Sequence, residues 1–168
     1  MARRKKKKPQ QKPIQYHVGF IGSMQCELWD YRKQISIEAE KELTSKPLHI
    51  DCTIFKTDVS TTIKPAIASH FLGHNLIEYK SWRQSLHWST VLQLATYAMQ
   101  YSRLTIHSNP GILEDITMTV FTYKYNPKFF ANLSEHKCSY VEKYPGVYEI
   151  TGFSIIPLYI VVIKNLPK

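Results

Sequence analysis

Two segments of the chain are apolar on both faces when they are read as β-strands, and they constrain the fold more than any other feature. Residues 158–163 (LYIVVI) carry no polar interruption but a tyrosine, and residues 48–55 (LHIDCTIF) are broken mainly by His49 and Asp51. Strands that are apolar on both faces belong to the centre of a covered sheet. The sequence therefore predicts that the 158–163 strand lies centrally in a sheet.

The remaining periodicities predict which elements surround this strand. Helices are expected where apolar residues recur every three or four positions, or where an Asn–Pro pair opens a segment: 19–33, 82–103 and 127–136. Strands are expected at 35–39, 48–55, 74–80, 116–125 and 158–163, with a hairpin over 140–150 that turns at Tyr144-Pro145-Gly146-Val147 and a short helix from Pro65. The order α-β-β-β-α-β-α-β-β-β predicts one α/β (α+β) domain over residues 16–168, a mixed sheet flanked by helices.

The helix predicted over 82–103 has an apolar stripe that is expected to be its buried face. Its members are spaced three and four residues apart: Trp88, Val91, Leu92, Ala95, Ala98 and Met99.

Most of the positive charge lies at the amino terminus. Seven Lys and Arg residues and no acid occur in residues 1–13, and without them the net charge falls from +9 to +2. Like charges with nothing apolar beside them predict a disordered basic arm over residues 1–15. Such an arm attracts nucleic-acid phosphates, and a solubilising tail is the alternative.

Cysteine usage and hydropathy concern the cellular compartment. Cys26, Cys52 and Cys138 are scattered without a C-x-x-C pair, which predicts neither a disulfide framework nor a zinc site and suits a reducing cytosol. The basic amino terminus is not followed by the apolar run of a signal peptide. The most apolar stretch, 155–163, is far shorter than the ~20 residues of a membrane helix. The sequence predicts a soluble cytoplasmic protein.

Charged residues inside two predicted strands point to a site. Asp51 interrupts one strand, and Glu78 and Lys80, which share a face because they are two residues apart, interrupt the next. If the strands pair antiparallel, Asp51 lies beside Glu78, and a hard divalent cation such as Mg²⁺ relieves the repulsion. The backbone carbonyl of Tyr79 offers a further oxygen. The alternative is an internal salt bridge from Lys80 to Asp51 or Glu78.

Other sequence patterns exclude several classes of site. His70 and His74 have the spacing of a helical zinc site, but Gly73 and the strand beginning near residue 75 argue against a helix there. The chain has no nucleophile elbow, Walker loop or dinucleotide fingerprint, which argues against serine hydrolases, NTPases and Rossmann enzymes.

Three short motifs in order carry a resemblance to a known family. Ile50-Asp51, then Ile77-Glu78-Tyr79-Lys80-Ser81, then Gln93 and Tyr97 in the following helix resemble the motifs of the PD-(D/E)XK nuclease superfamily. The Q-x-x-x-Y helix is similar to that of RecB-type nuclease domains. Residues 16–166 are similar to bacterial superfamily members labelled recombination-promoting nucleases or transposases, which suggests a link to recombination or mobile elements.

The resemblance implies a restriction-endonuclease-like core of order α-β-β-β-α-β and a metal-dependent nuclease that hydrolyses phosphodiester bonds in DNA. It implies that Asp51 and Glu78 bind Mg²⁺ or Mn²⁺, that Glu27 in the first helix is an additional metal-holding acid, and that Lys80 orients or activates the attacking water. A homodimer is expected if both DNA strands are cut.

The resemblance also implies that Gln93 and Tyr97 position Lys80, the nucleophile or the DNA backbone. On a helical wheel, both lie opposite the predicted apolar stripe, so they face the site only if that stripe packs away from it. Two other classes of protein stay open: a nucleic-acid-binding protein that keeps the nuclease fold without cutting, and a structural protein in which Asp51 and Lys80 form a buried ion pair.

Overall fold

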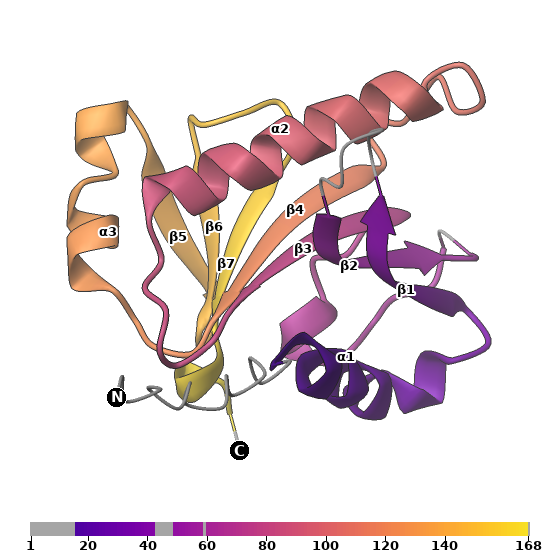
Figure 1. Ribbon diagram of the computed structural model, residues 1–168, viewed down its shortest axis with the longest axis horizontal. Coiled ribbons are helices and arrows are strands. Elements are labelled where there is room, and N and C mark those ends of the chain that lie inside the picture. Colours follow the sequence, from indigo (N-terminus) through magenta and orange to yellow (C-terminus); the bar gives the residue numbers. More distant parts are fainter. Residues whose placement is uncertain (1–15, 43–48, 59, 168) are drawn as a thin grey trace, which may run out of the picture.

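The computed structural model describes residues 16–42, 49–58 and 60–167, and its centre is a seven-stranded mixed sheet (Figure 1). The predicted basic arm lies outside the described residues. Across the sheet the strands run in the order β1 (Ile35–Glu42), β2 (His49–Lys56), β3 (His74–Lys80), β4 (Ile116–Thr122), β7 (Leu158–Val162), β6 (Val147–Thr151) and β5 (Ser139–Tyr144).

The middle of the sheet is parallel and both outer parts are antiparallel. β3 pairs with β4, and β4 with β7, in parallel, whereas β1–β2, β2–β3, β7–β6 and β6–β5 pair antiparallel. β7 therefore lies inside the sheet, between β4 and β6, which confirms the position predicted from its apolar sequence. The observed order of helices and strands also confirms the predicted mixed α/β architecture.

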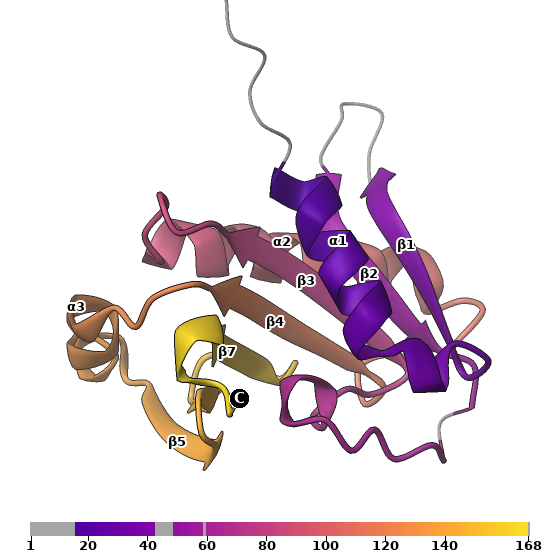
Figure 2. The ribbon, with the colours of Figure 1, turned by 90° about the horizontal axis from the view of Figure 1, so that it is seen from below.

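Helices cover both faces of the sheet. Helix α1 (Tyr16–Glu27) lies on one face and α2 (Trp88–Thr105) crosses the other, so that α1 is in front of the sheet and α2 behind it in Figure 2. The short helix α3 (Pro127–Ala131) packs on the same core as α2 through Phe129 and Phe130. The α2-side core includes Leu76, Val91, Leu94, Met118, Val120 and Ile160. The α1-side core includes Phe20, Met24, Leu28, Cys52, Ile77 and Phe121.

Helix α2 begins later, and buries a different face, than the sequence predicts. It starts at Trp88 instead of residue 82. Leu92 and Met99, which belong to the predicted stripe, are 56% and 42% exposed. The buried face instead contains Val91, Leu94, Tyr97, Ala98 and Tyr101. The predicted stripe was therefore partly wrong, and the helix is rotated so that its tyrosines face the sheet.

Two local predictions from turn and cap residues are confirmed. The Asn126 side chain accepts a hydrogen bond from the Phe129 N–H and caps α3, with Pro127 in the first turn. In the β5–β6 turn Gly146 has φ +81°, and a Cβ there would lie 2.9 Å from the Val162 carbonyl oxygen. Glycine is required at this turn because both the backbone angle and the close approach of β7 exclude a side chain.

No helix among the described residues combines the length and the apolar character that crossing a bilayer requires.

Candidate functional site

Strands β2 and β3 separate at Asp51. Their pairing runs from Phe55–His74 to Cys52–Ile77 and stops, whereas β2 continues to His49 alongside β1. A regular antiparallel ladder would next bond the Tyr79 N–H to a backbone carbonyl of β2. That N–H instead donates to Asp51 Oδ2 at 2.9 Å. The Asp51 carboxylate thus joins the two strands at the point where their backbones diverge.

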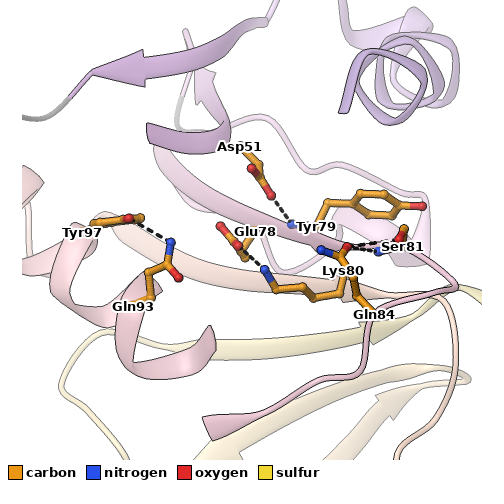
Figure 3. Close-up of polar contacts among 8 residues, drawn as sticks. All are labelled: Asp51, Glu78, Tyr79, Lys80, Ser81, Gln84, Gln93 and Tyr97. Atoms are coloured by element: carbon orange, nitrogen blue, oxygen red, sulfur yellow. Dashed lines mark hydrogen bonds and ion pairs between the residues drawn. The ribbon is translucent and has the colours of Figure 1, made fainter. Parts of the chain in front are cut away.

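The two acids and the lysine lie on one face of the sheet, the face that α2 covers. Glu78 and Lys80 are separated by even numbers of residues from Leu76, which belongs to the α2-side core. Asp51 is separated in the same way from Phe55, which packs against that core, and its neighbour Ile50 belongs to the core as well. Figure 3 shows all three polar side chains on this side. The structure thus brings together the three residues that the sequence singled out.

Both carboxylates are largely removed from solvent. Asp51 is 9% exposed and Glu78 is 4% exposed. Lys80 Nζ lies 2.5 Å from Glu78 Oε1, and its side chain is 17% exposed. With one ammonium and two carboxylates, the formal charge of these three groups is −1 when all are ionised. A buried ion pair needs this close geometry because desolvation of each partner is costly.

The thiol of Cys52 is buried and lies next to the negatively charged Asp51. Burial and the adjacent Asp51 carboxylate raise the pKa of the Cys52 thiol to about 12, from an ordinary value of 9.0. The thiol is therefore protonated at neutral pH, and it points to the α1-side core. It offers neither a nucleophile nor a soft metal ligand, so the chemistry available here comes from carboxylate oxygens and an ammonium group.

Helix α2 adds an amide and a phenol to the same face. Gln93 Nε2 donates to the Tyr97 hydroxyl at 2.8 Å, and both side chains project from α2 toward Glu78 and Lys80 in Figure 3. Tyr97 is buried, whereas Gln93 lies at the exposed rim. The sequence predicts a buried stripe on the side of α2 opposite to Gln93 and Tyr97. Because the buried face of α2 includes Tyr97 instead of Leu92 and Met99, the helix can pack on the sheet and also direct Gln93 and Tyr97 toward the site.

A turn that the sequence did not single out holds the chain just after Lys80. The buried Ser81 donates from its backbone N–H and its hydroxyl to Gln84 Oε1, at 3.0 and 3.1 Å. The S-x-x-Q spacing of Ser81 and Gln84 is that of a capping box, and this pattern in the sequence could have predicted the turn. The turn fixes the direction in which the chain leaves β3.

Glu27 does not belong to this cluster. It is exposed on α1, whose Phe20 ring stacks on the Tyr79 ring with centroids 4.5 Å apart. Both rings lie on the α1 face, opposite to Asp51 and Glu78, and Glu27 lines a groove of about 450 Å³ beside them. The helical spacing located Glu27 beside the apolar face of α1, but it could not tell which face of the sheet α1 covers. Tyr79 contributes its backbone to the site, and ligation by its carbonyl oxygen stays a prediction.

His70 and His74 lie on opposite faces, so they form no metal-binding pair. His74 Nδ1 is 2.6 Å from the Tyr101 hydroxyl on the α2 side. His70 Nε2 is 2.9 Å from Thr119 Oγ1, and its ring lies over Tyr159 on the α1 side. Burial lowers the pKa of His70 to about 3.

The donor set fits a hard divalent cation. Mg²⁺ prefers oxygen ligands and typically takes one or two carboxylates, with water and substrate phosphate completing its octahedron. Asp51 and Glu78 supply two carboxylates on one face. Within residues 16–42, 49–58 and 60–167 there is no group of three or more His, Cys, Asp or Glu side chains that could enclose a metal ion. With two carboxylates as ligands, the other positions of a Mg²⁺ octahedron would fall to water and substrate.

No protein-family model, curated protein or solved structure matches the chain.

Proposed function

We propose that the protein is a magnesium- or manganese-dependent nuclease that hydrolyses phosphodiester bonds in DNA, with α1, β1, β2, β3, α2 and β4 as a restriction-endonuclease-like core. The observation that carries the proposal is the pair of buried carboxylates, Asp51 and Glu78, on one face of diverging strands with Lys80 beside them. Two acids in a sheet interior are costly to keep, and a structural role would be met by uncharged residues at lower cost.

Asp51 and Glu78 would hold the divalent ion. Such an ion supplies a more acidic water molecule and polarises a phosphate oxygen. Lys80 orients the attacking water through its ammonium N–H groups and offsets negative charge that develops on the phosphate. Its contact with Glu78 keeps the ammonium at the site before substrate arrives.

Gln93 and Tyr97 act as positioning residues. Their mutual hydrogen bond fixes the amide at the exposed rim of the site, where its remaining donor and acceptor can face a DNA phosphate or Lys80. The basic residues of the amino terminus would add affinity for DNA that depends on salt concentration. Cleavage of both strands at one place would require two copies of the site, which a homodimer provides.

A second candidate is a nucleic-acid-binding protein that does not cut. One observation favours it: the charge of Glu78 is already balanced by Lys80 at 2.5 Å, and Asp51 already holds the Tyr79 N–H. In that case both carboxylates would be structural, and binding of DNA would proceed without turnover in any divalent metal.

Cleavage assays with matched variants distinguish the two. Supercoiled plasmid and single-stranded oligonucleotides are incubated with Mg²⁺, Mn²⁺ or EDTA. Asp51→Asn keeps an oxygen that can accept from Tyr79 but removes the charge, and Asp58→Asn removes an exposed carboxylate elsewhere. We expect metal-dependent cleavage that falls by about a hundredfold or more in Asp51→Asn and Lys80→Ala, in line with the loss of a group that stabilises transition-state charge, and that is unchanged in Asp58→Asn.

Equal cleavage by the wild-type protein and Asp51→Asn would refute the assignment. Binding of Mn²⁺, measured by electron paramagnetic resonance, provides a second readout. One ion bound by the wild-type protein and lost in Asp51→Asn supports the proposed ligands, whereas retention of that ion excludes them.

A further inference from the structure

A groove of about 420 Å³ opens at the carboxyl ends of β3 and β4. One wall is the segment 82–87 between β3 and α2, and the other is the segment 122–128, which runs from the last residue of β4 into the first turn of α3. The described residues that line it include Lys124 and Lys128 and no carboxylate. A concave surface of this charge suits an anionic ligand.

The groove begins where the Asp51–Glu78–Lys80 cluster ends. Lys80 is paired in register with Thr122, which lines the groove, and the Tyr123 N–H donates to the Lys80 carbonyl oxygen at 3.3 Å. Gln84, which fixes the turn after Lys80 by accepting from Ser81, lines the groove too. A chain-like ligand that lies in the groove would therefore run along β3 to the carboxylates.

The two walls are tied together. Asn126 Nδ2 donates to the Leu86 carbonyl oxygen at 2.8 Å, across the groove from β4–α3 to β3–α2. The other end of the same amide, Oδ1, accepts from the Phe129 N–H. The position of the two walls relative to each other is thus fixed by specific hydrogen bonds without a ligand, which lowers the cost of binding.

Exposed aromatic side chains also line the groove, next to its positively charged residues. Trp82 is 52% exposed, and the Arg83 guanidinium lies 4.7 Å from its ring centroid. Tyr125 is 36% exposed and is stacked on Phe130, with ring centroids 4.5 Å apart and an angle of 11° between the ring planes. Exposed rings next to cations are the features with which proteins bind single strands, because bases stack on the rings while phosphates contact the cations.

We infer that this groove binds a short single-stranded segment of nucleic acid and leads it to the Asp51–Glu78–Lys80 cluster. Bases stack on Trp82 and phosphates contact Lys124 and Lys128. In a duplex the base faces are already stacked on one another, so the indole would gain little from duplex DNA. The binding step stands on the groove alone, whereas delivery to a cleavage site rests on the proposed function.

Fluorescence anisotropy in EDTA tests the binding without cleavage. The probes are labelled oligo-dT, oligo-rU and a duplex of equal length, at several KCl concentrations. Lys124→Gln/Lys128→Gln removes two cations from the groove, and Trp82→Ala removes the ring. The control Lys33→Gln/Lys64→Gln removes two exposed cations near the start of β3, at the other end of the sheet. All variants keep the same amino terminus.

For the single strand, we expect Lys124→Gln/Lys128→Gln to bind about tenfold more weakly and to lower the slope of log affinity against log salt by about 1.4, since each phosphate contact contributes about 0.7. Trp82→Ala should weaken single-strand binding by about fivefold or more and leave duplex binding unchanged. Trp82→Phe, which keeps a ring, should restore most of the affinity.

Equal losses in Lys33→Gln/Lys64→Gln, or a Trp82→Ala protein that binds single strands as the wild type does, would overturn the inference. Binding of either oligo-rU or oligo-dT through these side chains supports the inference. The oligonucleotide that binds more tightly shows whether the groove prefers RNA or DNA. If the protein binds single strands through Trp82 but does not cleave DNA with any divalent metal, the groove proposal stands and the nuclease proposal is refuted. If it cleaves DNA equally well in the wild type and in the groove variants, the nuclease proposal stands and the groove proposal is refuted.

Discussion

Replacing Lys80 by methionine tests how strongly the buried Glu78 carboxylate depends on the ammonium group beside it. The two charged atoms lie 2.5 Å apart, and the side chains are 17% and 5% exposed. Removing one partner of a buried pair costs about 3–5 kcal/mol. Because Lys80 retains some contact with solvent, we expect the lower end, about 3 kcal/mol. For a chain of 168 residues this lowers Tm by about 6–12 °C.

A second ion pair in the same protein provides the control. Lys143 Nζ and Glu149 Oε2 are 2.6 Å apart, but their side chains are 48% and 25% exposed. Lys143→Met should cost at most about 1 kcal/mol, because solvent screens this pair. Thermal and urea unfolding, followed by circular dichroism, gives the free energy of unfolding of each variant.

A double variant separates the lost attraction from the lost packing. In Glu78→Gln/Lys80→Met neither charge is buried, so we expect much of the stability lost in Lys80→Met to return, with a coupling free energy of about 2 kcal/mol. The reasoning is refuted if Lys80→Met is no more destabilising than Lys143→Met, or if the double variant is the sum of the two single ones.

Three further predictions concern other described side chains. Gln93→Ala should lower metal-dependent cleavage by about tenfold, as loss of a positioning contact does, with Tm unchanged; full activity would remove Gln93 and its partner Tyr97 from the site. Because the folded-state pKa of His70 is about 3 and its ordinary value is 6.5, the unfolded chain binds a proton that the folded protein excludes, so stability falls as pH drops below 6.5. Urea unfolding at pH 5 should show a loss of about 2 kcal/mol relative to pH 7 that His70→Asn abolishes, and equal pH dependence in both would exclude this cause. Finally, a thiol reagent at pH 8 should react quickly with the exposed Cys26 and slowly with Cys52, whose pKa is about 12; an unchanged fast phase in Cys26→Ser would contradict this.

The strands and the face of the candidate site could be predicted from the sequence because strand geometry has a period of two. Glu78 and Lys80 must share a face whatever the register of β2 against β3, and the register that pairs Cys52 with Ile77 brings Asp51 to the same face. The central position of β7 followed in the same way from its two apolar faces. These predictions needed only local pattern and one pairing.

The contribution of the helices could not be predicted so easily. Helix α2 has apolar residues around most of its circumference, and counting them favoured a stripe with Leu92 and Met99. Packing instead buries Tyr97 and Tyr101, whose hydroxyls meet Gln93 and His74. Such partners come from tertiary structure, which a helical wheel does not contain.

The location of β7 has a consequence for synthesis of the protein. Strand β7 (Leu158–Val162) pairs with β4 on one side and with β6 on the other, so it joins the β1–β4 part of the sheet to the β5–β6 hairpin. It follows both parts in the sequence and is therefore synthesised last. Until Leu158–Val162 has been synthesised, β4 and β6 each lack the strand that pairs with them in the finished sheet. The complete sheet therefore forms only after β7 has left the exit tunnel, and a chain that stopped before Leu158 would lack the strand that joins its two parts.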